Sequence, residues 1–153
     1  MDFRIPDELT ALRQSFAAFL DREVRPLEEQ YAPEFWGEAP NREALAPVIR
    51  DVRLRSAQEG FYAAYMPEDA GGQGLSVLGT TLLVEDAAHS GMRLAMAAIA
   101  PPNPAGPSTL LLKLPPHLWE EYLLPVVAGE KTMCFALTEP EAGSDAQAIR
   151  TRA

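Results

Sequence analysis

The sequence predicts a mainly α fold, a helical bundle that is followed by one or two β-strands near its C-terminal end. Apolar residues recur at steps of three and four through most of the first part of the chain, which indicates amphipathic helices. After Gly129 this periodicity stops and β-compatible residues replace it. The 153 residues, 47% hydrophobic and 23% charged, suit a globular domain that buries a core.

The first predicted helix begins at Pro6-Asp7, because proline and an acidic residue favour the first helical turn. Its inward stripe consists of Leu9, Leu12, Phe16, Phe19, Leu20 and Val24. Pro26 predicts that the helix is kinked or ends early, since proline removes a backbone donor. Residues 31–40 (YAPEFWGEAP) are typical of a loop.

Asn41 is the predicted N-cap of a second helix, and Gly60 is its predicted end. The residues expected to point inward are Leu45, Val48, Ile49 and Val52. Glycines between Met66 and Ser76 predict a connector. A third helix, predicted from Ser76 to His89, is apolar on most of its faces, which indicates burial on several sides.

The stretch from Met92 to Ala100 is apolar nearly all round, and we expect a helix in a bundle centre or at an assembly interface. A proline-rich break (PPNPAGP) follows it. A short helix is predicted from Ser108 to Leu114. Pro115 and Pro116 then start another helix that ends near Gly129.

The C-terminal residues predict a strand over Thr132 to Leu137, a loop, and the beginning of a second strand in the final residues AIRTRA. Two strands have marginal stability alone, and unpaired strand edges invite association. We therefore expect the chain to be incomplete at its C-terminal end. The terminal strand and the apolar segment Leu94 to Ala100 predict that it forms dimers or aggregates.

Composition excludes several classes of function. The net charge of -9 and the absence of a Lys/Arg cluster argue against nucleic acid as a partner. The N-terminus has no apolar signal region, and the longest apolar stretch, Leu94 to Ala100, is too short to cross a membrane. A single cysteine, Cys134, suits a cytoplasmic protein and is expected to pack as a small apolar residue. His89 and His117 have no spaced ligand partners, so no metal site is predicted.

The segment TEPEAGSD, residues 138–145, is the best candidate for a binding loop. Pro140 fixes φ and Gly143 permits positive φ, so a turn with exposed backbone N–H groups is expected. These groups, with the hydroxyls of Thr138 and Ser144, could bind the edge of a heteroaromatic ring or a phosphate oxygen. On turn chemistry alone, a surface turn without a ligand is the favoured interpretation.

Three segments change that balance, because they resemble signatures of the acyl-CoA dehydrogenases in the same order. CFALTEPEAGSDA resembles the flavin-binding signature of the family. MPEDAGGQGLSVLGTTLLVEDAAHSG and WEEYLLPVVAGEKTMCFALTEP resemble the segments that precede it. The resemblance implies a helical N-terminal domain over residues 1–130. It also implies that residues 131–153 begin the family's β-domain, here truncated, and carry the flavin-binding loop.

The resemblance also implies roles for individual residues. Phe135 to Ser144 would line FAD, with Leu137 and Thr138 beside the isoalloxazine ring and Gly143 and Ser144 near the pyrophosphate. Ser144 would also lie close to the CoA part of the substrate. The preceding helices would wall the acyl pocket, and Leu94 to Ala100 would be its principal lining.

The reaction implied is α,β-desaturation of an acyl-CoA thioester, in which a carboxylate removes the α-proton and a hydride passes to the flavin. In the family this carboxylate and a second flavin segment come from a later region, so no catalytic residue is assigned within these 153 residues. A homo-oligomer and electron transfer to an electron-transfer flavoprotein are implied for the complete enzyme. The segments LKLPPHLWEE and PPNPAGP depart from the family pattern and leave the substrate class open.

Two alternatives remain open from the sequence. The chain could belong to a flavin monooxygenase or an acyl-CoA oxidase with the same fold, which an oxygen-reactive flavin would distinguish from a dehydrogenase. It could also be a helical assembly module without catalysis, which would bind neither flavin nor acyl-CoA.

Overall fold

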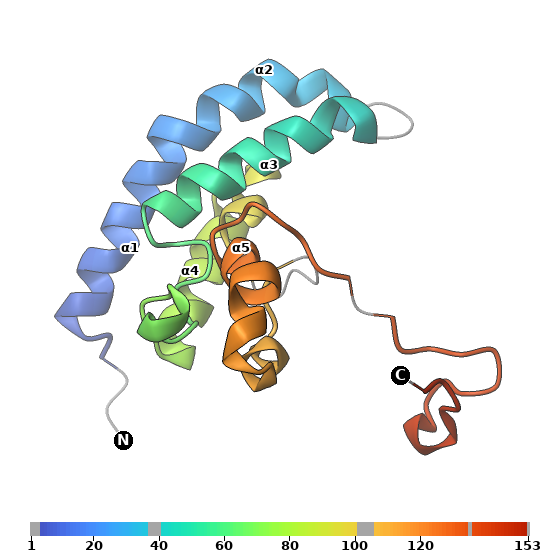
Figure 1. Cartoon of the computed structure of the whole chain (residues 1–153). Helices are drawn as coiled ribbons and strands as arrows, with labels where there is room; N and C mark the ends of the chain where they lie inside the picture. Colours follow the sequence, from blue (N-terminus) through green and yellow to red (C-terminus); the bar gives the residue numbers. More distant parts are fainter. Residues whose placement is uncertain (1–3, 37–40, 101–105, 135, 153) are drawn as a thin grey trace.

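The computed structural model describes residues 4–36, 41–100, 106–134 and 136–152, and its regular elements are nearly all helical (Figure 1). Five are α-helices: α1 (Asp7–Phe19), α2 (Arg25–Trp36), α3 (Arg42–Gln58), α4 (Val77–His89) and α5 (Leu124–Val127). The 3-10 helices are η2 (Glu68–Ala70), η3 (Leu94–Ala98), η4 (Thr109–Lys113), η5 (Pro116–Leu118) and η7 (Ala146–Ala148). Two π-helical turns complete the set, η1 (Leu20–Val24) and η6 (Trp119–Leu123). The predicted mainly α fold is confirmed.

The first three elements, α1, η1 and α2, follow one another without a break (Figure 1). Pro26 does not end the helix, because the π turn directly before it widens the hydrogen-bond pattern, with the Arg25 amide donating to the Leu20 carbonyl. The helix also continues through Pro33 to Trp36, so the loop predicted for residues 31–40 is wrong over 31–36. Residues 37–40 of that prediction lie outside the described residues.

Helix α3 begins and ends where the sequence predicts. The Asn41 side chain accepts a hydrogen bond from the Ala44 amide at 3.2 Å, and Gly60 follows the helix with φ +84°. One inward prediction is wrong, since Ile49 is 36% exposed while Leu45, Val48 and Val52 are buried. Ile49 lies beside the buried stripe rather than within it.

Helix α4 buries one face only, which corrects the prediction of burial on several sides. Ser76 caps it by accepting a hydrogen bond from the Gly79 amide at 3.2 Å. Leu82, Leu83 and Ala87 are buried, but Val77 is 84% exposed at the start of the helix. Neighbouring elements therefore cover only part of the apolar surface of α4, and Val77 stays exposed.

The apolar segment after α4 forms the short 3-10 helix η3 rather than an α-helix, and it lies inside the core. The Ser56 hydroxyl of α3 donates to the Ala98 carbonyl at 2.6 Å, and the Glu28 carboxylate of α2 accepts from the Leu94 amide at 2.9 Å. Between Leu94 and Ala100 only Met96 is not fully buried. The chain covers this segment itself, so one of the two reasons for predicting association is wrong.

Two apolar clusters hold the helical body together. The larger cluster joins α1, η1, α2, α3, α4 and η3, and three of its aromatic rings, those of Phe16, Phe19 and Phe61, lie 5.1 to 6.3 Å apart. The smaller cluster attaches η6 and α5 to the rest, and its buried members are Tyr62, Ala63, Met66, Ala70, Ala100, Leu123 and Val127.

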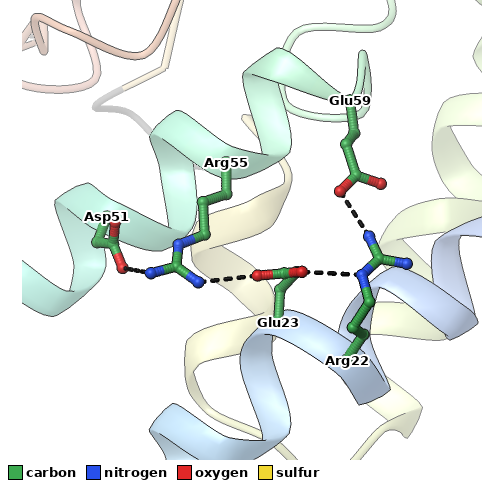
Figure 2. Close-up of polar contacts among 5 residues, drawn as sticks. All are labelled: Arg22, Glu23, Asp51, Arg55 and Glu59. Carbon is green, nitrogen blue, oxygen red and sulfur yellow. Dashed lines mark hydrogen bonds and ion pairs between the residues drawn. The ribbon is translucent and has the colours of Figure 1, made fainter.

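A chain of ion pairs on the surface joins the π turn η1 to helix α3 (Figure 2). Glu23 lies at its centre, accepting from Arg22 at 2.8 Å and from Arg55 at 2.8 Å. Asp51 pairs with Arg55, and Glu59 pairs with Arg22. All five side chains are at least partly exposed, so this network supplements the apolar contacts below it.

After residue 131 the chain leaves the helical body and extends away from it (Figure 1). The strand predicted for Thr132 to Leu137 is wrong in the described residues 132–134 and 136–137, and the second strand predicted at the end is wrong up to residue 152. In the described part of this segment the one β-type pairing is an isolated bridge between Glu139 and Ala142. A strand needs a hydrogen-bonded neighbour, and no such neighbour lies alongside this segment among the residues that the structure describes.

No helix in the described ranges is both long and apolar enough to cross a membrane.

Candidate functional site

The candidate loop starts with a tight turn over residues 139–142. The Glu139 amide donates to the Ala142 carbonyl at 3.0 Å, and the Ala142 amide donates to the Glu139 carbonyl at 3.2 Å. Pro140 and Glu141 occupy the two corners of the turn, where proline is favoured because its φ is fixed. The predicted turn is therefore present at Pro140, whereas Gly143, expected to allow a positive φ, does not adopt one.

The Glu139 side chain closes the loop around this turn. One carboxylate oxygen accepts from the Arg150 amide at 3.0 Å, and the other accepts from the amide of Thr151 at 2.8 Å and from its hydroxyl. Hydrogen bonds to the charged carboxylate lower the pKa of Glu139 below its usual value. The largest effect comes from the Thr151 hydroxyl, and smaller effects come from the amides of Arg150 and Thr151. We call this set of contacts the Glu139 clasp. A carboxylate held in this way is a weak base.

Two other acidic residues of the loop are also engaged. Asp145 accepts from the Gln147 amide at 3.1 Å and so caps the 3-10 helix η7. Glu141 pairs with Arg150 at 3.2 Å on an exposed surface. The loop from residue 139 to residue 151 is thus held by its own polar contacts.

The residues predicted to bind a cofactor lie in or just before this loop. Thr138, Gly143 and Ser144 are exposed, and Leu137 is 48% exposed. A Cβ atom added at Gly143 would have nothing within 4 Å. Within the described part of the chain, the amides of Gly143 and Ser144 form no hydrogen bond, so these donors are available to a ligand. Phe135 lies outside the described residues.

The predicted acyl-pocket lining, Leu94 to Ala100, is placed in the core of the helical body. Leu94 to Ile99 belong to the larger cluster, and Ala100 belongs to the smaller one. The segment therefore has a structural role that is independent of any substrate. Its role as a pocket wall remains a prediction.

A surface hollow of about 520 Å³ on the helical body was not foreseen from the sequence. It lies between the α1–η1 region and the end of α4. Its lining includes a bidentate ion pair, in which the Arg13 guanidinium donates to both carboxylate oxygens of Asp86 at 2.8 and 2.5 Å. Arg25, also in its lining, pairs with Asp21 at 2.6 Å. Because Arg13 is paired with Asp86 and Arg25 with Asp21, the positive and negative charges of these four side chains balance one another within the hollow.

The cysteine and the two histidines add no chemistry to this picture. Cys134 is exposed, which corrects the prediction that it packs as a small apolar residue. His89 and His117 are both exposed, and the Nδ1 atom of His89 lies 3.0 Å from the Glu85 carbonyl oxygen. Over the residues that the structure describes, no group of three or more His, Cys, Asp or Glu side chains is arranged to hold a metal ion.

Reasoning from the sequence missed the hydrogen bonds by which Glu139, Arg150 and Thr151 hold the loop. Glu139 is separated from its partners by 11 and 12 residues, and no periodic pattern links these positions. The one feature of the sequence that points to this position is Glu139, an acidic residue directly before Pro140. That signal predicts a turn but does not indicate what the side chain binds.

Comparison with known proteins places the chain in a family. The family model for "Acyl-CoA dehydrogenase, N-terminal domain" matches residues 6–130. The probable acyl-CoA dehydrogenase FadE25 of Mycobacterium tuberculosis is 34% identical over 99% of this chain and 36% of its own length. Benzylmalonyl-CoA dehydrogenase of Aromatoleum aromaticum is 29% identical over 100% of this chain and 37% of its own length.

A third relative is the caffeyl-CoA reductase-Etf complex subunit CarC of Acetobacterium woodii, which is 36% identical over 68% of this chain and 27% of its own length. No solved structure was found to match the chain. The chain spans little more than a third of the length of FadE25 and of benzylmalonyl-CoA dehydrogenase. With its helical body and the matching N-terminal family model, the chain belongs to the acyl-CoA dehydrogenase family.

Proposed function

We propose that this chain supplies the flavin-contacting loop and part of the helical wall of an FAD-dependent acyl-CoA dehydrogenase. The observation that carries the proposal is the loop over residues 138–151, which is held by its own polar contacts and exposes Gly143 and Ser144, whose amides have no hydrogen-bond partner among the described residues. Family membership supports the same reaction class, the removal of hydrogen across the α,β bond of an acyl-CoA thioester.

The donors of the loop fit the acceptor-rich groups of FAD. The amides of Gly143 and Ser144 and the Ser144 hydroxyl would bind pyrophosphate oxygens, because anions are bound well by successive backbone N–H groups. Thr138 and Leu137 would contact the isoalloxazine ring, the former by its hydroxyl and the latter by its exposed apolar side chain. When bound, FAD supplies the hydride acceptor of the reaction. Ser144 would also contact the CoA part of the substrate.

Glu139 is assigned to loop architecture and not to proton removal. Its two oxygens already accept hydrogen bonds from Arg150 and Thr151, and its pKa is lowered by the Thr151 hydroxyl and these amides. A general base works best when its pKa lies near the working pH, and these contacts move Glu139 away from that range.

The remaining parts of the proposal concern the whole enzyme. We assign residues 1–130 to the helical N-terminal domain and residues 131–153 to the start of the β-domain. The name of CarC includes an Etf complex, which supports an electron-transfer flavoprotein as a partner. Because CarC is named a reductase, hydrogen transfer in the reverse direction is the second candidate activity. Homo-oligomeric assembly and a cytoplasmic location stay predictions from the sequence.

A titration of the chain with FAD, followed by quenching of flavin fluorescence, tests the proposal. We expect saturable binding that weakens by about twofold to tenfold in Thr138→Ala and in Ser144→Ala, the loss expected for one neutral hydrogen bond. Thr10→Ala and Ser15→Ala are matched controls, because both hydroxyls are exposed on α1 and bond within their own helix. Binding that is absent, or that is unchanged by the loop variants, would contradict the assignment of the flavin to this loop.

A further inference from the structure

The chain leaves the helical body through a short, well-defined exit at residues 129–131. Gly129 follows α5 with φ +76°, a backbone conformation that favours glycine. The amides of Glu130 and Lys131 both donate to the Pro125 carbonyl, at 2.9 and 3.0 Å. These bonds are local, since they join the exit to the helix that it has just left.

One contact ties this exit to a distant part of the chain. The Nε atom of Arg53, on α3, donates to the Gly129 carbonyl at 2.7 Å across 76 residues of sequence. A Cβ atom at Gly129 would lie only 3.0 Å from Cγ of Arg53, so the exit packs directly on the arginine stem. Arg53 is 8% exposed, which is unusual for an arginine.

The surroundings of Arg53 keep water away from this bond. Tyr62, fully buried, lies close by: burial raises the pKa of its phenol, and the charge of Arg53 partly opposes that rise. Among the described residues no carboxylate forms an ion pair with Arg53. The bond from Arg53 to the Gly129 carbonyl is buried, in an environment where a hydrogen bond is stronger than in water.

From this geometry we infer that Arg53 is a positioning residue: its bond to Gly129 ties the segment that carries residues 138–151 to helix α3. Thr138 follows Gly129 by nine residues. Without the tie, the exit keeps its bonds to α5 and the bond from the Lys131 Nζ atom to the Glu121 carbonyl of η6 at 3.1 Å, but it loses its connection to α3 and its direction is less constrained. The effect on FAD binding rests on the proposed function, whereas the tie itself does not.

Hydrogen exchange of the Glu130 and Lys131 amides tests the tie in three variants. Arg53→Met keeps an unbranched stem but removes the donor. Arg53→Gln places a side-chain amide N–H at the position of Nε without the charge. Arg50→Met is the matched control, because Arg50 is exposed on the same helix.

We expect exchange at the two amides to be about tenfold to a hundredfold faster in Arg53→Met, the loss expected for one charge-assisted hydrogen bond. Arg53→Gln should recover part of the protection, and Arg50→Met should leave it unchanged. Equal acceleration at the Leu83 amide in the core, or wild-type exchange in Arg53→Met, would overturn the inference.

If Arg53→Met does not fold, Arg53→Gln decides alone: faster exchange at 130 and 131 with unchanged exchange at Leu83 supports the tie, and wild-type exchange at the two amides overturns it. A parallel FAD titration separates this inference from the proposed function. Weaker binding in Arg53→Met together with lost protection supports positioning of the flavin loop. Failure of the wild-type chain to bind FAD would count against the proposed function and leave the exchange result standing.

Discussion

The helical body and the C-terminal loop of this chain are stabilised by different forces. In the body, large side chains such as Phe16, Tyr62 and Leu83 are almost completely buried in two apolar clusters. In the loop, Leu137, Thr138 and Ser144 are exposed, and the contacts are polar and local. The body is therefore specified by packing, and the loop by a few directional hydrogen bonds.

The difference explains where ligand chemistry can lie. A packed interior has few free donors, since buried polar groups are nearly always paired. An exposed loop that is closed by its own side chains keeps a defined shape and still presents amides such as those of Gly143 and Ser144, which are unpaired within the part of the chain that the structure describes. Binding residues carried on loops that a rigid scaffold positions are the usual arrangement in proteins.

The largest effect is expected from breaking the packed region. Phe16→Ala removes a fully buried ring that lies 6.3 Å from Phe19 and 5.1 Å from Phe61. We expect it to lower the free energy of unfolding by about 3–5 kcal/mol, because a cavity forms among the remaining rings. Urea unfolding followed by circular dichroism measures this loss.

The control for that prediction comes from the other region. Leu137→Ala removes a side chain that is 48% exposed, and we expect a change within about 0.5 kcal/mol. A large loss in Leu137→Ala would show that the loop segment packs against the body, and the contrast between the two regions would then fail.

Reasoning from the sequence succeeded where one local signal decides the structure. Asn41 and Ser76 cap their helices through hydrogen bonds to amides three residues later. Gly60 follows the end of α3 because its backbone adopts a positive φ. Prediction failed where residue type alone does not decide the structure. Pro26 is accommodated by the π turn directly before it, and the apolar segment at Leu94 lies in the core, where it adopts a 3-10 helix and forms hydrogen bonds to α2 and α3.

The same distinction applies to the candidate site. The turn at Pro140 and the exposed position of Gly143 follow from residue types, so the sequence was sufficient to predict them. The bonds from Glu139 to residues 150–151 and from Arg53 to Gly129 depend on separations of 11 to 76 residues. A strand was predicted before the loop because β-compatible residues indicate a strand only where a partner strand is present.

A smaller and local effect is expected in Glu139→Gln, which weakens the clasp. Exchange at the Arg150 and Thr151 amides should become faster while the melting temperature of the body stays the same, since these contacts lie within the loop. Glu141→Gln is the matched control in the same turn, because its ion pair with Arg150 is exposed. A lower melting temperature of the whole chain would contradict the separation of the two regions.

The clasp should also depend on pH, with a sign fixed by the direction of the pKa shift. The pKa of Glu139 in the folded loop is lower than its usual value of 4.5. The contribution of the clasp is therefore complete above pH 4.5, and it is lost as the pH falls through the lowered pKa. The same exchange measurement, repeated at decreasing pH, should show the wild type approaching Glu139→Gln.

The smallest effect is expected from the ion-pair network on the surface of the body (Figure 2). Glu23→Gln removes the charge between Arg22 and Arg55, and we expect the melting temperature to fall by about 1–3 °C at low salt. Glu29→Gln is the matched control, an exposed glutamate on α2. At about 1 M salt the Debye length is roughly 3 Å, so the difference between the variants should disappear. A loss that persists at high salt would mean that Glu23 stabilises the body by packing, and polar contacts would then matter in both regions.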